Sequence, residues 1–425
     1  MESMVGKMTS RERVVAALNH KQPDQVPIDF GATVCSGIHA SCVATLRDYY
    51  GLEKRPVRIH ELGQMLGYVD DDLLDAMGVD VTGVFPRDSM YGFPTDEWKS
   101  WMFNGQEVLV PEDFNVTIDE KGDTLIYPGG DTTVPPCARM PKDGFFFDCI
   151  VRQDPIVEEN LNPEDNMEEF KEISQADIDH FARATDVAVT TGRAIVADFG
   201  GTTFGNVALV PGPSLKHPKG IRDIEEWYVS TNRRQDYVHK IFDWQCEVAL
   251  KNLERIYPAV GDRVDAIFLC TTDFGTQNSA FCSVKSFNNL FLPYYKRLSE
   301  WIHSHTTWKI LKHSCGAVSK FIPAFIDAGI DILNPVQCSA TGMDPGKLKA
   351  EFGDYMVFWG GGVDTQHVLP FCTPEEVREQ VLRRCEIFAP GGGFVFNTIH
   401  NIQAQTPLKN IIALIDALRE FNGTN

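Results

Sequence analysis

The sequence predicts an α/β fold, a (β/α)8 barrel of the TIM type with an N-terminal helix and a β-rich insertion. Two observations carry this prediction. From residue 170 onwards, short apolar runs alternate with amphipathic stretches that carry helix start signals. The apolar runs are continuous, which is typical of strands covered on both faces of a parallel sheet. The 425 residues allow two small domains or one large domain, and the barrel interpretation makes 1–425 a single domain.

Eight strands are expected to form the barrel. Two of them come early, at 26–30 and 79–84, and the later ones are expected at 194–198, 265–270, 308–313, 330–336, 356–360 and 393–399. Strands that alternate with helices through right-handed crossovers form a parallel sheet. An open doubly wound sheet is the alternative, but no G-x-G-x-x-G motif opens a helix in this sequence.

Three helices have clear start signals. Thr9 and Glu12 have the spacing of a capping box at the start of the N-terminal helix. Thr373 is an expected N-cap, because Pro374 and two glutamates follow it in the first turn. Thr406 also precedes a proline, and the last helix is expected to start there in the same way.

Residues 86 to about 150 have a different pattern. Short strand-like runs are separated by turn residues, which is typical of antiparallel strands and indicates an insertion into the barrel. Aromatic side chains flank this insertion, and they form either its own small core or a lid over an apolar substrate: Trp98, Trp101, Phe103, Phe145, Phe146 and Phe147.

The composition disfavours several classes of partner and location. Lys and Arg number 39 against 59 Asp and Glu, and the net charge of −20 disfavours nucleic acid and anionic membranes as partners. No apolar run approaches the ~18 residues of a membrane span, and residues 1–7 lack the pattern of a secretory signal. The eleven cysteines are scattered and odd in number, so reduced thiols and a cytoplasmic location are expected.

Polar side chains follow the expected strands at their carboxyl ends, where barrels of this type place their chemistry. This set mixes carboxylates, imidazoles, a thiol and amides, and it consists of Asp29, Asp198, Thr271, Thr272, Asp273, His313, Cys315, Gln337, Asp364, His400, Asn401 and Gln403. Such a mixture suits a metal site or an acid–base site.

His313 and Cys315 form the sharpest local signal. Side chains at positions i and i+2 of an extended segment point the same way, so this imidazole and this thiolate can reach one ion. Zinc accepts both donor types, and the alternative is a buried cysteine beside a hydrogen-bonded histidine. His400 at the last strand end is the expected third ligand, or else a capping or hydrogen-bonding histidine. Asp273 is a fourth ligand, an acid–base group or a loop cap.

Several segments resemble the uroporphyrinogen decarboxylase superfamily. The resemblance is carried by residues 313–316, 328–337, 362–364 and 373–377 and extends over nearly the whole chain. It implies a (β/α)8 barrel, in agreement with the alternation of strands and helices. The family contains decarboxylases and also zinc-dependent, corrinoid-linked methyltransferases.

The decarboxylase branch of this family fits the sequence badly. Its substrate carries many carboxylates, and the family meets them with an N-terminal segment that contains arginine. The corresponding residues 29–34 contain no basic residue here, and no arginine lies between Arg13 and Arg47. Binding of such a polyanion by a chain of net charge −20 is therefore not expected.

The methyltransferase branch fits better. In its methylcobalamin:coenzyme M type, zinc is held by His-x-Cys and by a cysteine at the end of the last strand. The resemblance places His313 and Cys315 on the first pair, whereas His400 replaces the cysteine. Residues 272–277 and 400–403 resemble an anaerobic subgroup implicated in O-demethylation of methyl ethers.

The sequence therefore leads to a hypothesis about function. A zinc-dependent methyltransferase would move a methyl group from a small methylated donor, an aryl methyl ether, to the Co(I) corrinoid (cobalamin) of a partner protein. The expected residues are the metal ligands His313, Cys315 and His400, the catalytic Asp273, and Gln337, Asp364 and Asn401 as residues that orient the donor.

Two alternatives stay open at this point. The reaction can run the other way, from methylcobalamin to a thiol or tetrahydrofolate acceptor, with the metal activating the thiolate. The barrel can also serve binding or regulation alone.

Overall fold

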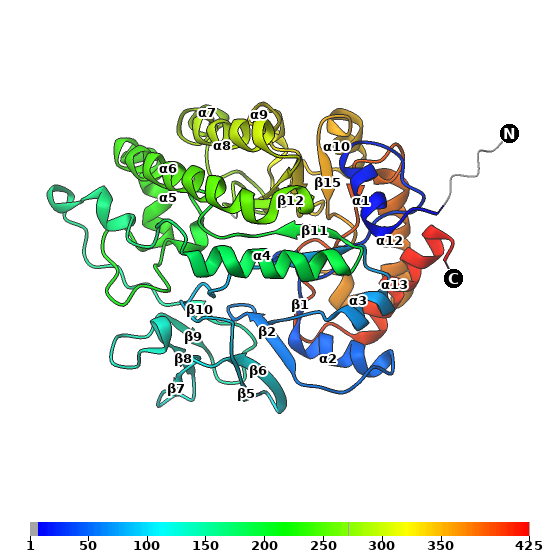
Figure 1. Ribbon diagram of the computed structural model, residues 1–425, viewed down its shortest axis with the longest axis horizontal. Coiled ribbons are helices and arrows are strands. Elements are labelled where there is room, and N and C mark those ends of the chain that lie inside the picture. The colour runs from blue at the N-terminus through cyan, green and yellow to red at the C-terminus, as the bar shows by residue number, and fades with distance from the viewer. Residues whose placement is uncertain (1–6, 271, 425) are drawn as a thin grey trace.

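A computed structural model describes residues 7–270 and 272–424 (Figure 1). Thr271, which was expected at the barrel mouth, lies outside the described residues. Within the described part, a parallel sheet and its surrounding helices form the larger body of the molecule. The strands of two smaller sheets gather in the lower part of the view, below helix α4 (Gln175–Thr190).

A seven-stranded parallel sheet forms the barrel wall, in the order β16-β15-β14-β13-β12-β11-β4. Its strands are β4 (Val81–Val84), β11 (Ala194–Ala197), β12 (Ala266–Cys270), β13 (Lys309–His313), β14 (Ile332–Asn334), β15 (Val357–Trp359) and β16 (Phe394–Val395). Each pair of neighbours is parallel, with Leu311 opposite Ile332 as one example of the register. The expected barrel and the positions of these strands are confirmed.

The eighth segment, 26–30, lies between the two ends of this sheet. Ile28 forms an isolated parallel bridge with Phe396, and the backbone N–H of Asp29 donates to the Phe396 carbonyl over 2.9 Å. On the other side, the N–H of Asp80 donates to the Ile28 carbonyl over 2.8 Å. The segment therefore bonds to both β16 and the chain just before β4, and it closes the barrel by a single bridge rather than a long strand.

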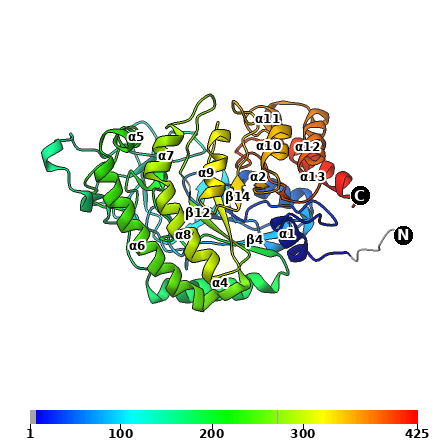
Figure 2. The ribbon, with the colours of Figure 1, turned by 90° about the horizontal axis from the view of Figure 1, so that it is seen from above.

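Helices pack around the barrel, and Figure 2 shows them from above. Besides α4 they are α1 (Ser10–Leu18), α2 (Ala40–Tyr49), α3 (Asp71–Met77), α5 (Ile224–Arg233), α6 (Gln235–Val260), α7 (Val284–Leu290), α8 (Leu292–His305), α9 (Ile322–Asp327), α10 (Pro345–Phe352), α11 (Val368–Phe371), α12 (Pro374–Phe388) and α13 (Leu408–Asn422). None of the helices in the described ranges has the length and apolar character that crossing a membrane requires.

The helix start signals are confirmed in two of the three cases. The side chains of Thr9 and Thr373 accept a hydrogen bond from the backbone N–H of the third helical residue. That residue is a glutamate in both helices, and its side chain accepts from the backbone N–H of the threonine, which completes the capping box. The prediction for Thr406 is wrong by one residue, since α13 takes Pro407 as its N-cap. The Thr406 hydroxyl donates instead to the Gln403 carbonyl over 2.8 Å and tightens the turn before the helix.

The remaining strands form two sheets, one mixed and one antiparallel. A five-stranded sheet has the order β1-β3-β2-β6-β5, and a four-stranded sheet has the order β10-β9-β8-β7. Their strands are β1 (Ile38–His39), β2 (Val57–Glu61), β3 (Leu66–Gly67), β5 (Trp98–Phe103), β6 (Gln106–Pro111), β7 (Val116–Ile118), β8 (Thr124–Ile126), β9 (Ala138–Met140) and β10 (Asp148–Cys149). Strands before residue 86 thus pair with strands after it, as β2 does with β6.

Aromatic side chains fill the space between these strands. Trp101 stacks on Phe103 with ring centroids 5.7 Å apart and meets Phe114 edge-on at 5.1 Å. Phe103 and Phe147 are buried, whereas Phe146 is 37% exposed. Most of the aromatic cluster is therefore a core of this region.

Candidate metal centre

His313, Cys315 and Asp273 meet at the carboxyl ends of β12 and β13. His313 is the last residue of β13, and its Nε2 atom lies 3.3 Å from the Cys315 Sγ atom. Asp273 follows β12, and its Oδ1 atom lies 3.8 Å from the same nitrogen. The three ligand atoms all lie within 4.8 Å of one another. As the spacing predicts, the imidazole and the thiol face the same point.

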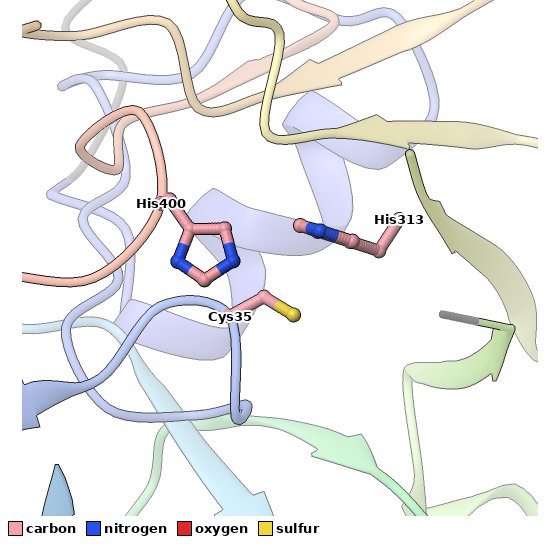
Figure 3. A group of neighbouring side chains, drawn as sticks. All are labelled: Cys35, His313 and His400. Atoms are coloured by element: carbon pink, nitrogen blue, oxygen red, sulfur yellow. The ribbon is translucent and has the colours of Figure 1, made fainter. Parts of the chain in front are cut away.

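A second group of ligand atoms contains His313, His400 and Cys35, and these also lie within 4.8 Å of one another. The two imidazole rings have centroids 5.2 Å apart and planes inclined by 78°. Figure 3 shows the three side chains converging from separate segments, with the Cys35 sulfur directed toward the space between the rings.

Cys35 was not among the residues singled out from the sequence. It lies in the loop 31–37 that follows the segment 26–30, so it too comes after a barrel strand. Its place after a barrel strand was the one feature of the sequence that could have indicated a ligand. Cys35 is, however, five residues beyond Phe30 and has no histidine beside it. Only the folded loop brings it to the histidines.

The three predicted ligands are thus distributed over two groups. Within the described residues, His313 belongs to both groups, Cys315 to the first and His400 to the second. The two groups together bring one carboxylate, two thiols and two imidazoles to one region of the barrel mouth.

Burial disfavours the charged forms of these groups when no cation is present. Burial lowers the pKa of His313 to about 4 and that of His400 to about 3, so both rings are neutral at pH 7 and offer lone pairs. Burial raises the pKa of the Cys35 and Cys315 thiols well above the usual range, and Asp273 adds to the effect at Cys315. Burial also raises the pKa of Asp273. A divalent cation would reverse this preference, because it favours the deprotonated ligands.

Asn334 fixes the ring of His313. The Asn334 Nδ2 group donates to the Trp359 carbonyl over 2.9 Å, so its Oδ1 atom is left as an acceptor. That oxygen lies 2.6 Å from His313 Nδ1. Nδ1 therefore carries the ring proton, and the lone pair of Nε2 faces Cys315 and Asp273. Partners of this kind orient metal-binding histidines and raise their basicity.

His400 has a local constraint of its own. Its backbone has a φ of 69°, in the left-handed region that few residues other than glycine adopt. The Asn401 N–H donates to His400 Nδ1 over 2.9 Å, so this nitrogen is unprotonated in the arrangement described. Coordination through Nε2 would move the ring proton to Nδ1 and would open the contact with Asn401.

The Asn401 side chain bonds three protein groups. Its Oδ1 atom accepts from the Gly37 N–H over 2.6 Å, and its Nδ2 group donates to the Val34 carbonyl and to Gln64 Oε1, both over 2.9 Å. Asn401 is fully buried. These contacts tie the loop 31–37 to the residue beside His400.

Gln337 and Asp364 are also engaged within the protein. Gln337 Oε1 accepts from the Gly316 N–H over 2.8 Å, and its Nε2 group donates to Gln277 Oε1 over 2.7 Å. Asp364 Oδ1 accepts from two backbone N–H groups, those of Gln366 and His367. The structure thus places Gln337 against the turn that follows Cys315. It places Asp364 at a tight turn after β15.

Two further carboxyl groups lie at the mouth. The fully buried Asp29 accepts from the Trp359 indole N–H over 2.8 Å and from the Ala32 N–H over 3.1 Å. Asp198 accepts from the Gly200 N–H over 3.0 Å. Burial raises the pKa of both groups to about 6. The mouth therefore gathers acidic side chains, and a polyanion would meet them there.

A family model matches most of the barrel. A family model for uroporphyrinogen decarboxylase (URO-D) matches residues 152–421. The uroporphyrinogen decarboxylase of Psychromonas ingrahamii is 32% identical over 89 residues, and that of Herminiimonas arsenicoxydans is 33% identical over 94 residues. Each alignment covers 20% of this chain and 24% or 25% of the relative. The chain thus matches about a quarter of the length of these curated relatives.

A solved structure is similar over nearly the full length. The methyltransferase from Methanosarcina mazei aligns with a TM-score of 0.55 and 14% sequence identity, over 97% of this chain and 99% of that one. At this identity the likeness concerns the fold.

Proposed function

This chain belongs to the uroporphyrinogen decarboxylase family, and from this premise we propose that it is a zinc-dependent methyltransferase. The reaction is the transfer of a methyl group from a small methylated donor, an aryl methyl ether, to the Co(I) corrinoid of a partner protein. The observation that supports the proposal best is the convergence of nitrogen, sulfur and oxygen donors around His313 at the barrel mouth.

The donor set fits zinc. Imidazole nitrogen, thiolate sulfur and carboxylate oxygen are the ligands that zinc takes in proteins, and catalytic sites keep one position for substrate. His313, Cys315 and His400 would hold the ion, with Asp273 beside them. When bound, zinc supplies Lewis acidity toward the oxygen of the donor.

The residues of this chain have separate tasks in the reaction. Asn334 holds His313 in the tautomer that presents Nε2 to the site. Asp273, whose pKa is raised by burial and whose side chain is 35% exposed, supplies a proton to the leaving group. The methyl group passes to the acceptor, while the oxygen keeps the electron pair of the broken C–O bond and takes this proton.

Decarboxylation of a porphyrinogen is disfavoured by the charges at the mouth. Residues 29–34 contain no lysine or arginine, and Asp29 and Asp198 are buried carboxyl groups nearby. A substrate with many carboxylates would be repelled where the family's decarboxylases attract it. An uncharged aryl methyl ether meets no such repulsion.

The choice of donor and acceptor rests on the resemblance of residues 272–277 and 400–403 to O-demethylating relatives. Methyl transfer from methylcobalamin to a thiol or to tetrahydrofolate is the second candidate. A thiolate-bound zinc also suits that direction, because zinc activates thiols by lowering their pKa.

The test is an assay of the metal-loaded protein with a reduced corrinoid protein and a panel of aryl methyl ethers. We expect formation of methylcorrinoid and of the free phenol in equal amounts. Turnover of methylcobalamin with a thiol, and none with any ether, would instead establish the second candidate.

A further inference from the structure

We propose that Cys35 is a ligand of the metal, so that two thiolates, those of Cys35 and Cys315, bind it together with His313 and His400. This inference rests on the proposed function, because it concerns the same metal, and it adds a ligand that neither sequence spacing nor family resemblance assigns. It predicts a metal centre with two sulfur and two nitrogen donors, which the oxygen of the methyl donor would join as a fifth ligand, since catalytic zinc can become five-coordinate.

The position of Cys35 carries the proposal. Its sulfur and the ring nitrogens of His313 and His400 lie within 4.8 Å of one another, so a metal at their centre reaches all three after small side-chain movements. Cys35 is 5% exposed, and its side chain points toward the two rings (Figure 3).

The loop that carries Cys35 is held on both sides of it. The side chain of Asn401 bonds the Val34 carbonyl before Cys35 and the Gly37 N–H after it. Because Asn401 is also the chain neighbour of His400, one residue sets the distance between the cysteine loop and that histidine. Hydrogen bonds on both sides of Cys35 would preorganise it as a ligand.

Bonds within the loop fix its shape. The Cys35 N–H donates to Thr33 Oγ1 over 3.2 Å, and the Thr33 and Ser36 hydroxyl groups lie 3.0 Å apart. The Gly31 N–H donates to the Ser36 carbonyl over 2.7 Å. Gly31 has a φ of 100°, and a Cβ there would lie 2.9 Å from Val69 Cγ2, so this turn needs glycine.

Charge balance favours a second thiolate. Zn²⁺ with one thiolate and two neutral imidazoles leaves a net positive charge in a buried place, which is costly to desolvate. A second thiolate makes the centre neutral. Each thiol loses its proton to solvent on binding, so two protons are released for each ion bound.

Asp273 is the competing source of negative charge. Its Oδ1 atom, however, accepts a hydrogen bond from the Cys315 N–H over 2.7 Å, so this oxygen already has a partner in the backbone. Asp273 also belongs to the group around Cys315, whereas Cys35 belongs to the group around His400. The two residues can therefore be told apart by substitution.

The test loads the full chain with Co²⁺ in place of zinc and follows the thiolate-to-cobalt absorption band in the near ultraviolet. For Cys35→Ser and for Cys315→Ser we expect the band to fall to about half of the wild-type intensity, since each variant loses one of two thiolates. Cys282→Ser, in which a partly buried cysteine outside both groups is changed, is the matched control and keeps the full band. Asp273→Asn also keeps it. A Cys35→Ser protein with the full band would overturn the proposal.

A second measurement does not depend on variants. X-ray absorption at the zinc edge of the wild-type protein counts the sulfur neighbours of the metal, and we expect two at about 2.3 Å. One sulfur neighbour, in a protein that transfers methyl groups, would overturn the role of Cys35 and leave the proposed function standing. Two sulfur neighbours in a metal-loaded protein that transfers none would overturn the proposed function alone.

Discussion

The ring orientation of His313 depends on a neighbour, Asn334, that the sequence analysis did not single out. Asn334 ends β14, and its Oδ1 atom accepts a hydrogen bond from His313 Nδ1–H, while its Nδ2 group donates to the Trp359 carbonyl. Without this acceptor, the ring proton could lie on either nitrogen, and Nε2 would not be kept unprotonated for a metal. The histidine supplies the donor atom, and Asn334 makes it available.

Substitution of Asn334 tests this relation. We expect Asn334→Ala to weaken binding of Zn²⁺ by about 10–100-fold, the usual effect of losing a partner that orients a ligand. Asn334→Asp keeps an acceptor and should restore much of the affinity. Competition with a chromophoric chelator measures both variants, and an unchanged affinity in Asn334→Ala would show that His313 does not bind the metal through Nε2.

His60 gives a prediction about pH at some distance from the ligands. Its ring lies 4.6 Å from Phe85 and 6.2 Å from Tyr68, and neither of its nitrogens has a hydrogen-bond partner among the described residues. Burial lowers its pKa from 6.5 to about 4. The unfolded chain therefore binds a proton at a higher pH than the folded protein does.

The folded state consequently loses stability as the pH falls from about 6.5 to about 4, by an amount on the order of 3 kcal/mol from this group. Thermal unfolding of the wild type and of His60→Leu at several pH values measures it. We expect the loss of melting temperature between pH 7 and pH 4.5 to be smaller in the variant. Equal losses in both proteins would show that His60 titrates normally.

At the scale of elements, the loop 31–37 and the turn 396–402 act as one unit. Asn401 joins them through Val34 and Gly37, and the Ile402 N–H donates to the Gly37 carbonyl over 3.0 Å. Asn401 was expected to orient the methyl donor, yet its amide bonds three protein groups. The contacts favour a role in holding the two segments together.

The two roles of Asn401 predict different kinetics. If it holds the loop, Asn401→Ala lowers metal affinity and costs about 1–3 kcal/mol of stability, because buried groups of Val34 and Gly37 lose their partner. If it orients the donor, the substitution raises KM and leaves metal binding unchanged. We expect the first result, and measuring metal affinity beside KM separates the two.

Elements with local signals could be predicted from the sequence, and those that depend on distant pairing could not. The barrel strands are continuous apolar runs, and the capping boxes at Thr9 and Thr373 are complete within four residues. The pairing of β2 with β6 joins segments some 50 residues apart, and no local pattern marks it. The start of α13 was predicted one residue early, because the Thr406 hydroxyl bonds back to the Gln403 carbonyl instead of capping the helix.

At the scale of the whole molecule, the site is assembled from segments that meet only when the barrel closes. The segment 26–30 bonds to β16 at one end of the sheet order, and this contact brings the loop with Cys35 beside His400. His313 and Cys315 could be paired from sequence, because their spacing alone directs both side chains to one side. Cys35 could not, since 365 residues separate it from His400 and 278 separate it from His313.

A metal that joins these segments stabilises the fold as a whole, because it binds the folded chain and finds no such site in the unfolded one. At an ion concentration of about 100 times Kd the gain is about 2.7 kcal/mol, so chelation should lower the melting temperature by a few degrees. His313→Ala removes the ligand shared by both groups, and its melting temperature should not respond to the chelator. Calorimetry of both proteins with and without chelator checks this, and an equal response would place the metal elsewhere.

The central claim is that one zinc ion lies at the barrel mouth, and anomalous X-ray scattering at the zinc edge tests it most directly. Crystals of the wild-type protein, purified without chelator and supplied with zinc, should show their strongest anomalous peak at bonding distance, about 2.0 Å, from a ring nitrogen of His313. A strongest peak that lies away from His313, or no peak at the mouth, would contradict the account.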